Sequence, residues 1–172
     1  MERRFLGMCQ GILVLTCTTY ARDMSADPLP AGPDPEAITR TLRERYPDTD
    51  VVEGLGATFF SIDPETHWPN YATIVTTDEH DLGSPSDLTA RPGVFRLNIC
   101  VGRATFERLV GDDRAADYAA VDRIVPHPVY AKQRWISILN PSDATFRDVV
   151  LPLIAEAHER LVVQRARQRT RG

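Results

Sequence analysis

Lysine is almost absent from this sequence. Lys132 is the only lysine among the 20 basic residues, and the formal net charge at pH 7 is −4. Proteins that bind nucleic acid usually carry a basic face, so we do not expect nucleic acid as a partner. Net charge informs solubility and association rather than fold, and the architecture has to be inferred from other features.

Cysteine is scarce as well. The three cysteines, Cys9, Cys17 and Cys100, are odd in number and include no Cys-x-x-Cys pair. This pattern argues against a disulfide framework and against a cysteine-based zinc site. Reduced thiols are typical of cytoplasmic proteins, and we therefore expect a cytoplasmic protein.

The familiar catalytic, metal and phosphate motifs are missing. No two histidines stand at helical ligand spacing, and neither His-Glu-x-x-His nor Gly-x-Ser-x-Gly occurs. Gly54-Leu55-Gly56 precedes an expected strand, so it cannot present a helix N-terminus to a phosphate. The motifs therefore predict no metal, no cofactor and no catalytic residue, although a fold could still assemble a metal site from distant residues.

Long hydrophobic runs are missing too. The apolar run Phe5–Leu15 is too short to span a bilayer, so we expect no membrane association. Arg3 and Arg4 precede it in the manner of a signal peptide, whereas Met24 offers an alternative start for the protein. On either interpretation, we expect residues 1–33 to be an extension outside the core.

Enough hydrophobic sequence remains to build one core. Of 172 residues, 42% are hydrophobic and 26% are charged, which is ordinary for a globular domain. A chain of this length fits one domain, which we place at residues 34–163. Residues 164–172 are polar and rich in arginine, and we expect a disordered tail there.

Periodicity and turn residues indicate grouped strands and helices. Asp34-Pro35-Glu36 predicts a helix start, and Asn140-Pro141-Ser142-Asp143 predicts the start of a C-terminal helix that Pro152 kinks or splits. Strands are predicted near 51–52, 58–62, 71–77, 94–101 and 135–139, and further short helices at 104–110 and 117–125. Strands that are grouped with helices rather than alternating with them indicate an α+β fold.

One strand and one loop carry the candidate site. In the strand at 94–101, period two places Leu97 and Ile99 against the core and Arg96 and Asn98 on the opposite face. The two prolines of Pro126–Tyr130 restrict the chain around His127, whose charge we expect to change near neutral pH. A small polar pocket is predicted from these residues and their neighbours, namely Arg96, Asn98, His127, Tyr130, Lys132 and Trp135. The alternative is that Tyr130 and Trp135 complete the core and His127 caps a loop.

Several of these segments resemble a known family. Tyr71–Thr76, Arg91–Ile99, Pro126–Tyr130 and Leu139–Asp143 resemble, in that order, the DUF6194 family of bacterial proteins of unknown function. The resemblance runs from about Pro35 to about Val162. It implies no activity, because none is established for that family.

A more distant resemblance concerns the order of the elements. Phe95–Asn98, Phe106–Leu109 and His127–Ser137 are similar to the MmcQ/YjbR family, in which a strand, a helix, a loop and a Trp-led strand follow one another. This likeness implies a single compact domain with a small antiparallel sheet and helices packed on one face, the double-wing fold. It also implies DNA binding, but Asn98 and Cys100 stand in the region of that family's strand lysine.

The absence of catalytic motifs favours a non-catalytic domain that binds a small ligand or a protein. Arg96 and His127 suggest a small polar or anionic ligand. Two alternatives are weak DNA binding, by analogy with the MmcQ/YjbR family, and an enzyme of unknown class that uses the polar pocket near His127.

Overall fold

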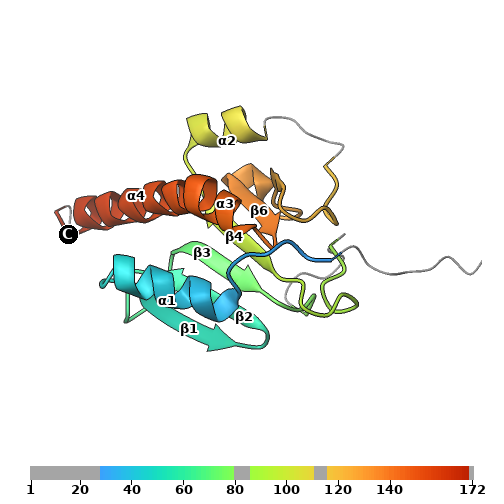
Figure 1. The fold of residues 1–172 in the computed structure, drawn as a ribbon. Helices are drawn as coiled ribbons and strands as arrows, with labels where there is room; N and C mark the ends of the chain where they lie inside the picture. The colour runs from blue at the N-terminus through green and yellow to red at the C-terminus, as the bar shows by residue number, and fades with distance from the viewer. Residues whose placement is uncertain (1–27, 80–85, 111–115, 171–172) are drawn as a thin grey trace, which may run out of the picture.

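A computed structural model describes residues 28–79, 86–110 and 116–170. Its centre is a six-stranded sheet in the order β1-β2-β3-β4-β6-β5, in which every pair of neighbouring strands is antiparallel (Figure 1). The strands are β1 (Asp50–Gly54), β2 (Ala57–Ser61), β3 (Asn70–Val75), β4 (Arg96–Cys100), β5 (Ile124–Pro126) and β6 (Trp135–Leu139). The helices are α1 (Pro35–Arg45), α2 (Arg103–Leu109), η1 (Ala131–Gln133), α3 (Asp143–Thr145), η2 (Phe146–Val150) and α4 (Leu151–Arg169). The α+β prediction is confirmed.

The first helix begins where the sequence predicts. The Asp34 carboxylate accepts a hydrogen bond from the main-chain N–H of Ala37 at 2.7 Å, which satisfies one of the free donors of the first turn. Pro35 occupies the first turn, where its missing N–H costs nothing. The spacing of four then brings Ile38 and Leu42 to one face, where both are fully buried.

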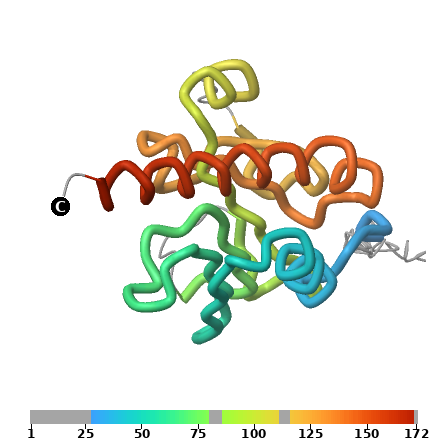
Figure 2. Tube along the Cα trace, turned by 90° about the vertical axis from the view of Figure 1, so that its left-hand side faces the viewer, coloured from blue at the N-terminus to red at the C-terminus, as the bar shows by residue number. Residues whose placement is uncertain are grey.

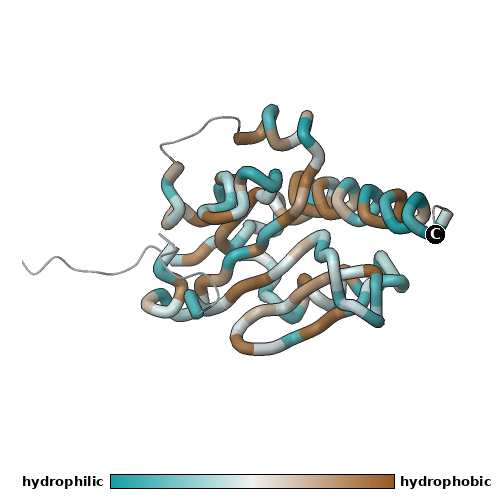
Figure 3. The backbone as a smooth tube through the Cα atoms, turned by 180° about the vertical axis from the view of Figure 1, so that it is seen from behind, coloured by the Kyte–Doolittle hydropathy of each residue, from teal (hydrophilic) through white to brown (hydrophobic). Residues whose placement is uncertain are grey.

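Helices α1 and α4 lie over one face of the sheet (Figures 1 and 2). That face contributes Leu97 and Ile99 to the core, together with Ile136 and Ile138 of β6. The alternation predicted for β4 is therefore confirmed, since Arg96 and Asn98 face the other side of the sheet. Figure 3 shows hydrophobic and hydrophilic residues interspersed along the backbone. Each strand has a second set of side chains on the face that α1 and α4 leave uncovered.

The predicted helix at 117–125 is wrong. Residues 124–126 form the edge strand β5, which pairs with β6, and Val121 bridges to Leu139. The reason is tertiary: β6 has a free edge once β4 occupies its other side, and backbone pairing there outweighs a weak helical pattern. Pro126 fits this edge position, because it does not have to donate to a second neighbouring strand.

The expected disordered tail is also wrong for residues 164–169, which are the last turns of α4. The reason is that Arg165 is held by the domain: it donates to the main-chain carbonyl of Ile62 and forms an ion pair with Asp63. Pro152 lies in the first turn of α4, after the π-helical turn η2, so the proline stands at a boundary between helical segments.

Only residues 28–33 of the extension expected at residues 1–33 belong to the described part of the chain. Residues 1–27 lie outside the described residues. Residues 28–33 pack on the domain: the Ala31 carbonyl accepts a hydrogen bond from the N–H of Asp143 at 2.9 Å, and Gly32 lies directly against the main chain of Pro141. None of residues 28–33 is buried or belongs to the hydrophobic core, but the segment packs on the surface against the start of the C-terminal helical region. Within the described ranges, no helix combines the length and the apolar character needed to cross a membrane.

Candidate functional site

A cavity of about 580 Å³ lies over the face of the sheet opposite α1 and α4. Its lining includes Phe59, Thr73, Arg96, Asn98, Cys100 and Trp135 from strands, Trp68, His127 and Tyr130 from neighbouring loops, and Gln133 from η1. Two other hollows, of about 540 and 620 Å³, lie along α1 and α4 and are lined mainly by exposed side chains. Buried polar groups from several elements converge only on the first of these three, which makes it the candidate site.

Two residues of the cavity lining, Thr73 and Asn98, belong to a polar row that crosses three strands. The strand register places Thr73, Asn98 and Ser137 directly opposite one another on β3, β4 and β6. The Ser137 hydroxyl donates to Asn98 Oδ1 at 2.7 Å, and Asn98 Nδ2 donates to Thr73 Oγ1 at 3.0 Å. Asn98 and Ser137 are 1% and 2% exposed, so these bonds satisfy groups that have almost no access to solvent. The hydroxyl proton of Thr73 is then the donor that this row offers to the cavity.

Arg96 lies beside this row and is buried, with 1% of its surface exposed. Its Nη1 donates to the hydroxyl of Ser86 at 3.1 Å. Burial lowers the pKa of Arg96 to about 10, and the charge of Asp78 acts in the opposite direction. The guanidinium therefore keeps its charge at neutral pH, and that charge is countered within the protein.

His127 is fixed by the loop that carries it. The ring Nδ1 accepts hydrogen bonds from the main-chain N–H groups of Val129 and Tyr130, both at 3.1 Å. The main-chain N–H of His127 donates to the carbonyl of Trp135 at 2.9 Å. Because Nδ1 accepts twice, the ring proton stands on Nε2. Burial, followed by the charge of Arg96, lowers the pKa of His127 to about 3. The expectation that His127 changes charge near neutral pH is therefore wrong, since burial keeps the imidazole neutral.

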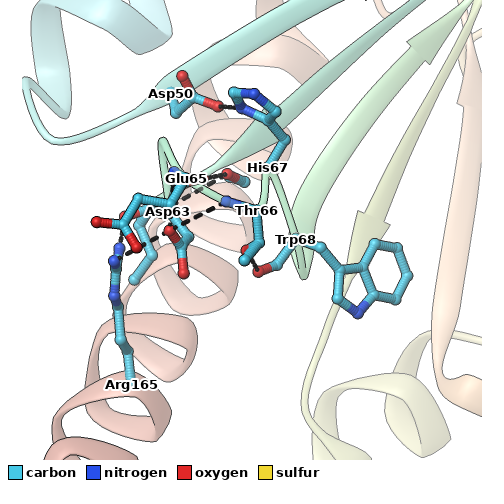
Figure 4. A network of polar contacts seen from close by, with 9 residues as sticks. Asp50, Asp63, Glu65, Thr66, His67, Trp68 and Arg165 are labelled. Atoms are coloured by element: carbon cyan, nitrogen blue, oxygen red, sulfur yellow. Dashed lines mark hydrogen bonds and ion pairs between the residues drawn. The ribbon is translucent and has the colours of Figure 1, made fainter.

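Two exposed aromatic side chains belong to the loop part of the lining. Trp68 is 65% exposed and Tyr130 is 48% exposed, and the Tyr130 ring lies 4.9 Å from that of His127. Trp68 ends a loop that begins at Asp63 and is held by its own polar network (Figure 4).

That network fixes both ends of the loop. Asp63 Oδ1 accepts hydrogen bonds from the N–H groups of Glu65 and Thr66, and the Thr66 hydroxyl donates to the carbonyl of Trp68 at 2.9 Å. His67 Nδ1 lies 2.6 Å from Asp50 Oδ2, and Figure 4 shows the two side chains pointing toward one another. Hydrogen bonds to backbone N–H groups lower the pKa of Asp63, and Arg165 adds to this effect.

The structure brings five of the six sequence-predicted residues around one cavity: Arg96, Asn98, His127, Tyr130 and Trp135. Lys132 is exposed on η1 and is absent from this lining. Sequence reasoning missed Phe59, Thr73 and Trp68. The first two share the uncovered face through the strand register, which alternation within single strands does not reveal, and no sequence pattern pointed to Trp68.

Comparison with known proteins identifies a family without an assigned role. Residues 33–171 match the model of DUF6194, a family of unknown function. No curated protein and no solved structure matches the chain. The likeness to the MmcQ/YjbR family and its double-wing fold finds no support in these comparisons.

Proposed function

Because this chain belongs to the DUF6194 family, whose function is unknown, we propose its function from the site: it is a binding domain that holds a small molecule in the cavity without transforming it. The observation that carries this proposal is the convergence of Arg96, Asn98, His127 and Trp135, from two strands and a loop, on one cavity. A volume of about 580 Å³ suits a small organic molecule. Because Asn98 and His127 are already held in place, the site loses less conformational entropy when a ligand binds.

The ionisation of the lining groups favours binding over catalysis. His127 is neutral at neutral pH, and its acceptor nitrogen already receives two hydrogen bonds, so it lacks a lone pair for a general base. Burial raises the pKa of the Cys100 thiol, so the reactive thiolate is disfavoured, although Arg160 and Arg134 act in the opposite direction. Cys100 is a free thiol, which also supports the cytoplasmic location that we propose for this protein.

A protein partner is a second candidate for the same site. Trp68, Val129 and Tyr130 are 65%, 52% and 48% exposed, and aromatic side chains of this kind are enriched in protein interfaces. A partner that covers these three side chains would close the cavity. Analytical ultracentrifugation of the purified chain tests the simplest case, a second copy of the same protein.

The experiment for the proposed function is a thermal-shift screen of small molecules, followed by titration of the hits against two variants. Tyr130→Ala removes part of the cavity wall, and Tyr118→Ala removes a tyrosine that does not line it. We expect hits to raise the melting temperature of the wild type and of Tyr118→Ala, and to lose affinity for Tyr130→Ala. Equal binding to all three proteins would place the ligand elsewhere and contradict the proposal.

A further inference from the structure

We infer that the ligand of this cavity is an uncharged, flat aromatic molecule that carries hydrogen-bond acceptors along one edge. This inference rests on the proposed function and names the class of molecule that the site selects. It depends on three features of the lining: its aromatic side chains, the kind of polar group that it offers, and the way in which its charges are already compensated.

Aromatic side chains line the cavity from four separate positions. Phe59 and Trp135 come from strands, and Trp68 and Tyr130 come from loops. The chain has only two tryptophans, and both belong to this lining. Aromatic side chains bury large areas and pack favourably against other rings, stacked or edge to face. A flat ring system therefore gains more contact here than a flexible polar molecule of the same volume.

Two polar groups of the lining are held as donors, and Asn70 adds a buried amide oxygen that is an acceptor. Thr73 accepts a hydrogen bond from Asn98 and keeps its hydroxyl proton for the cavity. His127 uses Nδ1 for two main-chain N–H groups, which leaves Nε2–H as the polar group of the ring. A carbonyl oxygen or a ring nitrogen on the ligand would satisfy these donors. A ligand without acceptors would displace water from them and leave them unpaired, which lowers affinity.

A charged ligand would find no suitable counter-charge. No carboxylate belongs to the described residues that line the cavity, so a cation would have no partner. The titratable lining groups are Arg96, Cys100, His127 and Tyr130. Of these, Arg96 carries a charge; it donates to Ser86 and interacts with Asp78, so an anion would compete with groups of the protein itself.

A matched series of three probes tests this inference. Indole-3-acetamide, indole-3-acetate and tryptamine share one ring system and differ in side-chain charge: neutral, negative and positive. Isothermal titration calorimetry of the full chain at pH 7 gives the affinity of each. We expect the amide to bind at least about tenfold more tightly than either ion. Both ions lose hydration in the cavity, the cation meets no carboxylate among the described residues of the lining, and the anion competes with Ser86 and Asp78 for Arg96.

Three variants then test whether the Thr73 hydroxyl donates a hydrogen bond to the ligand. Thr73→Val removes the hydroxyl and should weaken binding of the amide several-fold, whereas Thr73→Ser should retain it. Thr58→Val, on the neighbouring strand and outside the cavity lining, is the matched control and should leave the affinity unchanged. Near-UV circular dichroism confirms that each variant is folded. If Thr73→Val does not fold, the comparison of Thr73→Ser with wild type and the probe series on the wild type still decide the matter.

The outcomes separate the ligand class from the proposed function. Tighter binding of the acetate or of tryptamine, or equal binding of all three probes, would overturn the ligand class and leave the site in place. Failure of the whole series, alongside other molecules that bind in a Tyr130-dependent way, would overturn the ligand class alone. Failure of every small molecule, with a dimer that buries Trp68 and Tyr130, would overturn the proposed function as well.

Discussion

Arg165 in the last part of α4 forms an ion pair with Asp63, with 3.2 Å between Nη2 and Oδ1, and thereby fastens the loop that carries Trp68. The arginine also donates to the carbonyl of Ile62, so both the backbone and the side chain at the start of the loop are held. The C-terminal part of α4 is thus linked to the cavity through a short chain of polar contacts.

This link predicts that Arg165→Ala changes the environment of Trp68. In a Trp135→Phe background Trp68 is the only tryptophan, so its fluorescence reports the loop. We expect greater quenching by acrylamide after Arg165→Ala, because the loop loses an anchor and gains mobility. Arg167→Ala, two residues further along the helix, is the control and should behave like the parent. Identical quenching in all three proteins would show that the ion pair does not hold the loop.

The buried imidazole predicts a specific loss of stability in mild acid. The pKa of His127 is about 3 in the folded protein, below its ordinary value of 6.5. A lowered histidine pKa stabilises the fold above about pH 6.5, and this contribution is lost as the pH falls from there toward 3, because the unfolded chain binds the proton more readily. At pH 5 the loss from this one group is about 2 kcal/mol relative to pH 7.

His127→Asn is the matching variant, because its carbonyl oxygen can replace Nδ1 as an acceptor but does not titrate. Urea denaturation at pH 7 and pH 5 gives the free energy of unfolding for both proteins. The wild type should lose more stability than the variant between these two pH values. A parallel decline would mean that His127 takes up its proton as readily in the folded protein as in the unfolded chain.

Both faces of β4 are buried, which alters what substitution should do there. Leu97→Ala should cost roughly 2–5 kcal/mol, the usual range for a truncated core side chain. Asn98→Ala should also be destabilising, by about 1–3 kcal/mol, because it removes the partners of Ser137 and Thr73.

A double-mutant cycle with Ser137→Ala isolates the hydrogen bond between Asn98 and Ser137. Denaturant melts of the two single variants and of the double variant provide the coupling energy. Asn98→Ala alone leaves the Ser137 hydroxyl buried without its partner, and the double variant removes that hydroxyl as well. We therefore expect the double variant to be less destabilised than the sum of the single variants. Strict additivity would indicate that the polar row does not act as a unit.

The segment before α1 provides a test with a matched pair of glycines. A Cβ on Gly32 would collide with the main-chain carbonyl oxygen of Pro141, whereas a Cβ on Gly54 would meet open space. Gly32→Ala should therefore destabilise the protein by roughly 1–3 kcal/mol, as overpacking does, while Gly54→Ala should have little effect. Thermal melts compare them directly, and two equal melting temperatures would show that residues 28–33 do not pack as described.

Much of the fold could be predicted because local rules decide it. Asp34-Pro35 begins a helix by satisfying its own first turn, and alternation along β4 separates Leu97 and Ile99 from Arg96 and Asn98. The helix expected at 117–125 failed because pairing with the free edge of β6 is a tertiary effect that no local pattern reveals.

The candidate site was likewise predicted in part from local sequence patterns. Strand alternation and the proline-restricted loop pointed to Asn98 and His127, which line one cavity. Thr73 could not be found, because its place beside Asn98 depends on the pairing of β3 with β4. The neutral state of His127 also escaped prediction, since it follows from burial and from nearby Arg96 rather than from the residue itself.

The most direct test of the binding cavity uses the two tryptophans. In a ¹⁵N–¹H correlation spectrum their indole N–H groups give two signals that are separate from the backbone, and both side chains line the cavity. During titration with a ligand from the thermal-shift screen, we expect both indole signals to shift together and to saturate with one affinity, and Tyr130→Ala to weaken that affinity. Indole signals that stay unchanged while the ligand shifts residues of α1 or α4 would contradict the account.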